Sequence, residues 1–180
     1  ESYGCMYTRT TGIWQSVWLE AVGTAFIEKI RITPDVPNKR VLIWAQVDGA
    51  GRGMWLSAKA TLGDEDMGHA MGFMPGGQAS LVMDLKEARL WAPESPTLYN
   101  LHLAVTRKQE SVDSLETYFG LRSVTVQNRA ILLNDRPVFQ RTVLDQGFYP
   151  DGIWTAPTDE ALRGDIELSM AAGFNGARLH

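Results

Sequence analysis

The central part of the chain alternates apolar and polar positions with a period of two. Ile30 and Ile32 flank Arg31, and the same spacing recurs from residues 41, 81 and 101 onward. Such alternation indicates half-buried antiparallel strands, because successive side chains of a strand point to opposite faces. The apolar positions that carry the later runs are Val41, Ile43, Ala45, Val47, Leu81, Met83, Leu85, Leu101, Leu103 and Val105.

Polar and glycine- or proline-containing turn segments separate these runs. They are Pro34–Asn38, Asp48–Gly53, Gly63–Gly68, Pro75–Gly77, Pro93–Pro96 and Lys108–Ser114. Short strands at such intervals predict an all-β fold, an immunoglobulin-like β-sandwich of about seven strands. The single cysteine, Cys5, rules out an internal disulfide, so we interpret it as a packed thiol and expect the apolar core alone to hold the sandwich together.

The pattern changes after about residue 125. Asn134-Asp135-Arg136 separates Ala130–Leu133 from Pro137–Arg141, which predicts a hairpin. Thr158 is then followed by two acidic residues, which predicts a helix start with a capping side chain. Leu162, Ile166 and Met170 would form one apolar face, Gly173 would end the helix, and Phe174–His180 reads as a new strand. Strand, helix and strand in succession predict a short α/β tail with parallel strands.

The segment Thr8–Glu20 contains Trp14 and Trp18 at a spacing that would fit one face of a helix. Its composition nevertheless favours a strand. Ile13, Gln15, Val17 and Leu19 would lie on one side of that strand, with the tryptophans and Ser16 on the other.

Composition narrows the classes of function. The net charge is −4 at a pI near 5.4, and the basic residues are scattered, so we expect no binding to nucleic acid or to an anionic membrane. No apolar run approaches about 20 residues, and no basic leader precedes an apolar segment, so we expect no membrane span and no signal peptide. His69, His102 and His180 match no metal-ligand spacing, and we expect neither a metal nor a cofactor.

Several segments, taken in order, resemble glycoside hydrolase family 2, the group of β-galactosidases, β-glucuronidases and β-mannosidases. They are Thr10–Glu20 (TTGIWQSVWLE), Leu90–Tyr99 (LWAPESPTLY), Phe119–Arg122 (FGLR), Leu133–Arg141 (LNDRPVFQR), Asp165-Ile166 and Gly173–Arg178 (GFNGAR). The resemblance implies three pieces: residues 1–21 as the last strands of a jelly-roll sugar-binding-like domain, 22–125 as the immunoglobulin-like sandwich, and 126–180 as the start of a (β/α)₈ catalytic barrel.

Retaining glycoside hydrolysis needs two carboxyl groups about 5–5.5 Å apart. The resemblance implies that they come from the fourth and seventh barrel strands, and a whole barrel needs about 250 residues. We therefore expect this chain to be an inactive fragment of a β-galactosidase-like glycosidase. Its partners would be a carbohydrate substrate and the remaining domains of the same polypeptide, with the sandwich bracing the barrel.

The resemblance also points to three site residues. Arg178 matches a family arginine that holds the nucleophilic carboxylate, while Asp145 and Gln146 follow the first barrel strand, where the family contacts sugar. The sequence departs from the family there: Gln146 and Gly147 replace a usual His-acid pair, and Leu179-His180 replaces the usual residues after the arginine.

Two alternatives remain from other classes of function. The sandwich could be an accessory carbohydrate-binding module, which requires exposed aromatic side chains among Trp44, Trp55 and Trp91. It could instead be an immunoglobulin-like interaction domain, in which case the barrel-like tail and Arg178 would be coincidental.

Overall fold

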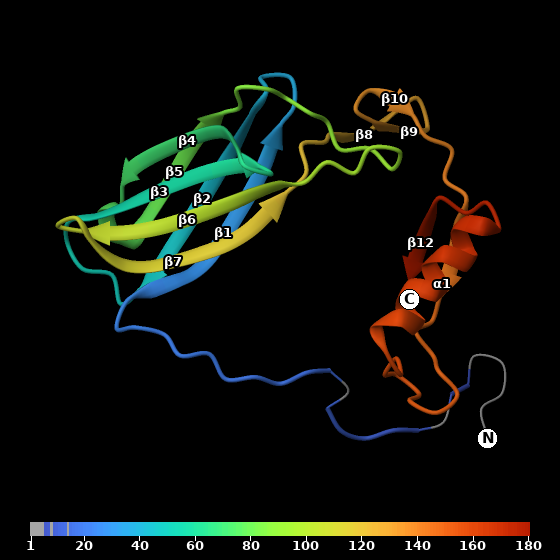
Figure 1. Cartoon of the computed structure of the whole chain (residues 1–180). Coiled ribbons are helices and arrows are strands. Elements are labelled where there is room, and N and C mark those ends of the chain that lie inside the picture. Colours follow the sequence, from blue (N-terminus) through green and yellow to red (C-terminus); the bar gives the residue numbers. More distant parts are fainter. Residues whose placement is uncertain (1–5, 8, 14) are drawn as a thin grey trace. The chain divides into compact units, whose positions relative to one another are not determined.

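The computed structural model describes residues 6–7, 9–13 and 15–180. These residues form two compact units, one of Ala21–Val138 and one that joins the described residues up to Glu20 with Phe139–His180 (Figure 1). The interpretations given for Cys5 and Trp14 lie outside the described residues.

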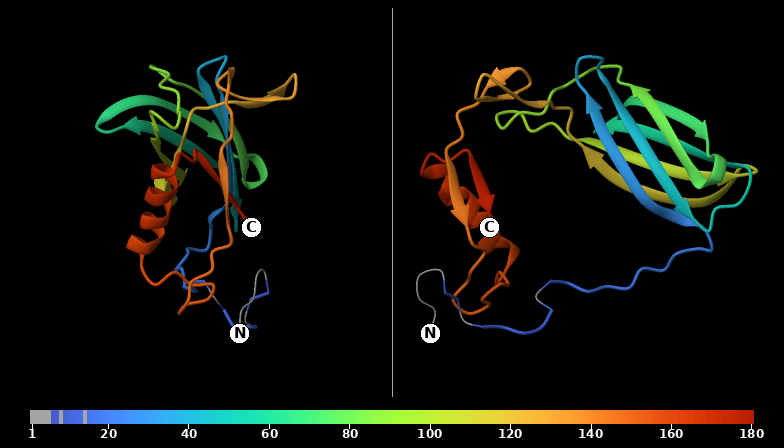
Figure 2. Two further views of the ribbon diagram at one scale, coloured as in Figure 1. Left: turned by 90° about the vertical axis from the view of Figure 1, so that its right-hand side faces the viewer. Right: turned by 180° about the vertical axis from the view of Figure 1, so that it is seen from behind.

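The larger unit is a β-sandwich. A three-stranded sheet has the order β1-β2-β5 and a four-stranded sheet the order β4-β3-β6-β7, with every pairing antiparallel. Figure 2 shows the two sheets packed face to face. The predicted all-β sandwich of about seven strands is confirmed. The strands are β1 Phe26–Asp35, β2 Arg40–Asp48, β3 Met54–Leu62, β4 Glu65–Phe73, β5 Gln78–Asp84, β6 Tyr99–Arg107 and β7 Glu110–Phe119, with a 3₁₀ turn at Pro75–Gly77.

The core follows the alternation that the sequence shows. In β2, Val41 and Ile43 are buried and Leu42 is exposed, and in β6, Leu101 and Leu103 are buried while His102 is exposed. The buried residues of the described chain are all apolar apart from glycines and the hydrogen-bonded tyrosine at the start of β6. Burial of apolar surface therefore holds the two sheets together.

Tyr99, the first residue of β6, is fully buried and stacks on Phe119 with ring centroids 5.1 Å apart. Its hydroxyl accepts a hydrogen bond from the Arg89 N–H (2.7 Å) and donates to the Glu87 carbonyl (3.0 Å). A tyrosine at this strand, bonded back to the preceding connection, is a hallmark of immunoglobulin-like sandwiches. The strand order differs from the constant-type immunoglobulin arrangement, because β4 pairs with β3 and not with β5.

Two predicted turns are shorter than expected. The turn placed at Gly63–Gly68 covers only Gly63 and Asp64, since β4 begins at Glu65, and the turn placed at Lys108–Ser114 covers only Lys108 and Gln109. Lys108 and Gln109 both have positive φ (52° and 68°), the geometry of a two-residue hairpin turn. The polar residues that follow are part of β7, because polar side chains are tolerated on the solvent face of a strand.

The larger unit also contains a third, smaller sheet, with the strand order β10-β9-β8. Its strands are β8 Val124–Gln127, β9 Ala130–Leu133 and β10 Arg136–Pro137. The predicted hairpin is confirmed, with Asn134 and Asp135 at its turn at φ 51° and 63°. The partner strand predicted over Pro137–Arg141 is much shorter, since only Arg136 and Pro137 pair with β9.

Asn134 connects this hairpin to two other segments. Its side-chain Oδ1 accepts a hydrogen bond from the Ser123 N–H, and its Nδ2 donates to the Trp91 carbonyl, each at 3.0 Å. Substitution Asn134→Ala is expected to lower the free energy of unfolding by about 1–3 kcal/mol, because it leaves these two backbone groups unpaired.

Asn128 offers a matched control, since it also begins a hairpin turn at positive φ (50°) and its side chain makes no hydrogen bond to a described residue. Urea unfolding of Asn134→Ala and Asn128→Ala checks the prediction. Equal losses in the two variants would show that backbone conformation alone sets the cost.

The smaller unit contains the predicted strand, helix and strand: β11 Thr142–Asp145, α1 Asp159–Ala171 and β12 Gly176–Leu179. The strands β11 and β12 are parallel, as expected. Thr158 caps the helix, because its Oγ1 accepts a hydrogen bond from the Ala161 N–H at 3.2 Å, and Gly173 follows the helix at φ 89°.

The helix face and the N-terminal segment of this unit differ from what the sequence predicts. The predicted apolar face of α1 exists in the sequence but stays uncovered, with Leu162, Ile166 and Met170 all exposed. The strand predicted over Ile13–Leu19 is wrong, because the described residues from Tyr7 to Thr24 include no strand and offer no pairing partner for one. Trp18 is consequently exposed.

Candidate functional site

The residues expected at a site lie where two parallel strands end. Asp145 is the last residue of β11, and Arg178 precedes the last residue of β12. The register pairs Asp145 with Leu179 and Leu144 with Arg178. The carboxyl ends of both strands therefore meet at one edge, where the sites of parallel α/β folds are built.

This edge does not bring the two side chains together. Directly paired residues of a sheet point to the same face and neighbours along a strand to opposite faces, so Asp145 and Arg178 lie on opposite faces of the pair. The Arg178 side chain is exposed and makes no hydrogen bond or ion pair with a described residue. Its guanidinium is thus free to pair with a carboxylate supplied from elsewhere.

Asp145 shapes the turn that follows β11. Its Oδ1 accepts a hydrogen bond from the Gly147 N–H at 2.7 Å, and its carbonyl accepts one from the His180 N–H at 2.9 Å. Gly147 has a φ of 64°, a conformation that glycine adopts without steric cost. Gln146, between them, is half-buried and has no hydrogen bond to a described residue.

The opposite ends of the strands are fastened by Asn175 and Arg141. The Asn175 Oδ1 accepts a hydrogen bond from the Arg141 N–H (2.8 Å), and its Nδ2 donates to the Phe139 carbonyl (2.9 Å). The Arg141 Nε donates to the Gly173 carbonyl at 2.8 Å. These contacts fix the register that places Asp145 and Arg178. Both residues lie in segments that the sequence singles out, although this role was not predicted.

The loop after β11 is tied to the helix by Tyr149, a residue that sequence reasoning missed. Tyr149 and Ile153 exchange backbone hydrogen bonds, and the Tyr149 hydroxyl donates to Asp165 Oδ2 at 2.9 Å. The hydrogen bond to Asp165 raises the pKa of Tyr149, and partial desolvation and the negative charges of Asp165 and Asp145 add to the effect. The resemblance marks Asp165, but nothing in the local sequence marks Tyr149 as its partner.

The raised pKa of Tyr149 predicts a pH dependence. The protonated hydroxyl stabilises the folded unit fully below the usual tyrosine pKa of about 10. That contribution is lost as the pH rises through the higher folded-state pKa. Ultraviolet titration of the chain and of Tyr149→Phe is expected to assign a transition above pH ~10 to Tyr149. In Asp165→Asn that transition is expected at lower pH, and an unchanged transition would contradict the role of Asp165.

Three aromatic rings gather beside the same loop. Tyr7 stacks on Phe148 with centroids 4.6 Å apart and meets Trp154 edge-on at 5.2 Å. Phe148 and Trp154 are also in edge-to-face contact, at 6.3 Å. Such pairs add to the stability that area burial alone provides, so they hold the loop against the N-terminal segment.

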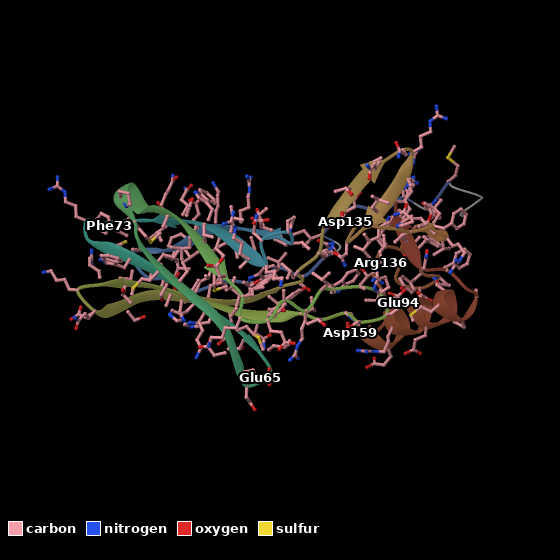
Figure 3. The ribbon with its side chains drawn as sticks, turned by 90° about the horizontal axis from the view of Figure 1, so that it is seen from above. Glu65, Phe73, Glu94, Asp135, Arg136 and Asp159 are labelled. Atoms are coloured by element: carbon pink, nitrogen blue, oxygen red, sulfur yellow. The ribbon has the colours of Figure 1, made fainter. Side chains whose placement is uncertain are left out.

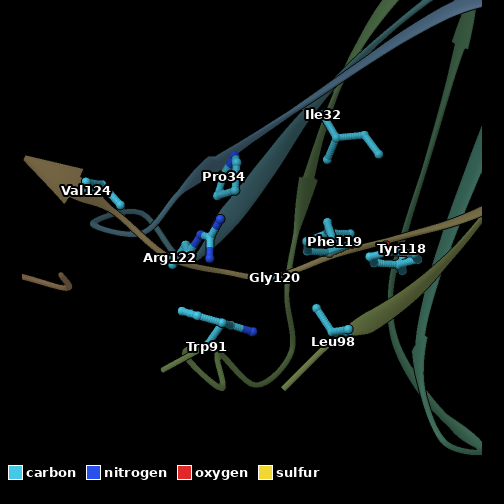
Figure 4. A pocket seen from close by; sticks show the side chains of 9 residues that line it. All are labelled: Ile32, Pro34, Trp91, Leu98, Tyr118, Phe119, Gly120, Arg122 and Val124. Carbon is cyan, nitrogen blue, oxygen red and sulfur yellow. The ribbon is translucent and has the colours of Figure 1, made fainter. Parts of the chain in front are cut away.

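The other resembling segments meet within the sandwich unit. The guanidinium carbon of Arg122 lies 4.4 Å from the centroid of the Trp91 ring (Figure 4). The Trp91 N–H donates a backbone hydrogen bond to the Leu121 carbonyl at 3.0 Å. A Cβ on Gly120 would approach the Trp91 side chain to 3.2 Å. A side chain at this position would therefore require the ring to move by a few tenths of an ångström.

These residues border a pocket of about 490 Å³ at one end of the sandwich. Because Trp91 is half-buried and covered by Arg122, it acts as packing material between segments and not as an open stacking platform. The lining residues are Ile32, Pro34, Trp91, Leu98, Tyr118, Phe119, Gly120, Arg122 and Val124.

The described residues contain no group of three or more histidine, cysteine or acidic side chains placed to hold a metal ion. In the same residues, α1 is too short and too polar to cross a bilayer as a helix.

Comparison with known proteins adds to this geometry. The model of glycosyl hydrolases family 2 matches residues 25–122. A β-mannosidase B from Emericella nidulans is 26% identical over 128 residues, 67% of this chain and 15% of the relative. A β-galactosidase from Pectobacterium atrosepticum is 31% identical over 102 residues, 56% of this chain and 10% of the relative. A putative β-glucuronidase from Formosa agariphila is 26% identical over 152 residues, 81% of this chain and 14% of the relative.

The crystal structure of a β-glucuronidase from Ruminococcus gnavus has the same fold over 86% of this chain and 26% of its own, with a TM-score of 0.71 at 19% identity. The chain spans only 10–15% of the length of the curated relatives. The family match covers more than half of the residues and contains the sandwich with its Trp91–Arg122 contact. The chain belongs to family 2 of the glycosyl hydrolases.

Proposed function

We propose that these residues are a non-catalytic part of a retaining β-glycosidase, in which the sandwich braces a (β/α)₈ barrel that β11, α1 and β12 begin. In this proposal residues 1–21 come from a jelly roll, 22–125 form the sandwich and 126–180 begin the barrel, although the compact unit that contains the sandwich extends to Val138. The observation that carries the proposal is the parallel β11–α1–β12 unit, which follows a family 2 sandwich and the small β8–β9–β10 sheet along the chain.

Arg178 is the positioning residue in this proposal. Its unpaired guanidinium would hold the nucleophilic carboxylate from a later barrel strand ionised and oriented through charge-assisted hydrogen bonds. Asp145 and Gln146 would contribute to the sugar site from the turn after the first strand, because the Asp145 side chain lies on the face opposite Arg178 and bonds to the Gly147 N–H. Because the two catalytic carboxyl groups would come from later strands, the 180-residue chain is inactive by itself.

The exposed face of α1 supports the same proposal. Helices of such barrels pack side by side in an outer ring, so Leu162, Ile166 and Met170 are where neighbouring elements of the barrel would pack.

Hydrolysis assays test the function. The complete polypeptide that carries these residues is expected to hydrolyse an aryl β-galactoside faster than the corresponding β-mannoside or β-glucuronide, and the 180-residue chain is expected to hydrolyse none. Turnover by the isolated chain would overturn the claim that it lacks the catalytic groups. Preference for another sugar would overturn only the galactoside assignment.

A further inference from the structure

The outer face of the four-stranded sheet carries an unusual set of side chains. Along β3, Leu56, Ala58 and Ala60 are buried, so Trp55 and Lys59, at the alternate positions, point away from the core. Ser57 and Thr61 lie on the same outer face. This row runs across the middle of the sheet, between β4 and β6.

One end of the face is aromatic. Trp55 is directly paired with Phe73 at the end of β4, and their ring centroids lie 5.6 Å apart at an interplanar angle of 61°. Trp55 is 45% exposed and Phe73 is 49% exposed, and Figure 3 labels Phe73 and Glu65 at the two ends of β4. Two neighbouring, half-exposed aromatic rings on a sheet are suited to pack against the apolar face of a ligand.

The other end of the face is a polar hollow of about 410 Å³. The ladder places Lys59 between His69 on β4 and His102 on β6, and it places Glu116 of β7 opposite His102. The residues that line the hollow are Lys59, Thr61, Asn100, Leu101, His102, Glu116 and Thr117.

Most polar side chains of this hollow have no hydrogen-bond partner among the described residues. The side chains of Lys59, Asn100, His102 and Glu116 make no hydrogen bond or ion pair with a described residue. The Lys59 ammonium group does attract the Asp66 carboxylate electrostatically. Asp66, at the neighbouring edge, is already paired with Lys86 at 2.8 Å. Donors and acceptors therefore face solvent together on one surface.

The chemistry of the face selects a class of ligand. Its hollow offers one ammonium group, on Lys59, and one carboxylate, on Glu116, so the two charges balance and favour neither a polyanion nor a polycation. Hydroxyl groups both donate and accept hydrogen bonds, as the mixture of Lys59, Asn100 and Glu116 requires. The six residue steps from Trp55 to Thr61 span roughly 20 Å, which exceeds a single sugar.

We propose that this face, from the Trp55–Phe73 pair to the hollow around Lys59 and Glu116, binds a neutral oligosaccharide. The rings pack against the apolar face of one sugar unit, and the polar side chains hydrogen-bond the hydroxyls of the following units. The site is separate from the strand ends of β11 and β12. It would stand even if the complete polypeptide hydrolysed no glycoside.

Nuclear magnetic resonance titration of the 180-residue chain with β-1,4-linked tetrasaccharides of mannose, galactose and glucose tests the proposal. At least one is expected to shift amide signals of β3, β4 and β6. Trp55→Ala and Phe73→Ala are expected to weaken binding about tenfold or more, as for central aromatic contacts. Trp44→Ala is the matched control, because Trp44 lies on the outer face of the other sheet. The affinity of this variant for the tetrasaccharide is expected to equal that of the unsubstituted chain.

Glu116→Gln and Lys59→Met keep the size of the side chains and test the polar hollow separately from the rings. Each is expected to weaken binding while the thermal unfolding of the chain stays unchanged. The proposal is wrong if no tetrasaccharide shifts the signals of this face. It is also wrong if only an acidic oligosaccharide binds, or if Trp55→Ala and Trp44→Ala bind equally well.

Discussion

Substitution Tyr99→Ala is expected to lower the free energy of unfolding of the sandwich by about 3–5 kcal/mol, the range for truncating a fully buried aromatic residue. Tyr99 is completely buried, and its ring stacks on Phe119. Its removal leaves a cavity between the sheets and also leaves the Arg89 N–H without its acceptor. Since domains of this size are stable by only about 5–15 kcal/mol, the loss is a large fraction of the total.

A companion variant separates the two parts of this effect. Tyr99→Phe keeps the ring and removes only the hydroxyl, so it is expected to cost about 1–3 kcal/mol. Tyr118→Ala is the control, because Tyr118 directly precedes Phe119 on β7, points to the opposite face of the strand and is 64% exposed. Chemical denaturation measures all three variants. A loss in Tyr99→Ala no larger than in Tyr118→Ala would contradict the assignment of Tyr99 to the centre of the sandwich.

Substitution Arg178→Ala in the complete polypeptide is expected to lower kcat about 100-fold, with little change in KM, because a misplaced nucleophile slows the reaction more than it weakens binding. The guanidinium also favours the ionised carboxylate. Its loss therefore raises the pKa of the nucleophile, and the acidic limb of the kcat/KM profile moves to higher pH.

Matched variants distinguish this role from a structural one. Arg178→Lys keeps the charge but loses the two-pronged geometry, so it is expected to recover part of the rate and most of the pH profile. Arg163, exposed on α1, serves as the control, and Arg163→Ala is expected to leave both unchanged. If Arg178→Ala lowers the rate without moving the acidic limb, Arg178 does not act on the nucleophile.

The sandwich could be predicted because every second residue of its strands is buried, which gives the sequence an apolar–polar alternation with a period of two. Val41, Ile43 and Leu103 are large apolar residues, so the alternation at β2, β5 and β6 is visible. The strands β3 and β4 give a weaker signal, since their inward positions include Ala58, Ala60 and Gly68. Small residues bury little surface and contribute little to the pattern, although they pack well between the sheets.

The strand ends of the smaller unit could be predicted only in part. Parallel topology alone implies that Asp145 and Arg178 end up at one edge. Their placement on opposite faces depends on the register, and a shift of one residue would reverse it. That register is set by the Asn175 and Arg141 contacts, which join residues 34 positions apart in the chain.

Contacts between distant residues also explain what the sequence could not show elsewhere. Asn134 bonds to Trp91 from 43 positions away, and Arg122 covers the Trp91 ring. Resemblance to family 2 marks these residues as a set without saying what they do. In the structure they join the hairpin, the long β5–β6 connection and the end of β7.

The exposure of the tryptophans separates the candidate roles of the sandwich. Trp91 is half-buried beneath Arg122, and Trp44 is half-buried on the three-stranded sheet. Of these three tryptophans only Trp55 is exposed, and its ring lies beside that of Phe73. A bracing role and a glycan-binding face can therefore reside on one sandwich, since they use different surfaces.

The most direct test of the central claim is the configuration of the sugar first released by the complete polypeptide, followed by nuclear magnetic resonance during hydrolysis of an aryl β-glycoside. A retaining mechanism with a nucleophile held by Arg178 predicts that the β-anomer appears first and then equilibrates. Initial release of the α-anomer, or no release of sugar at all, would contradict the account.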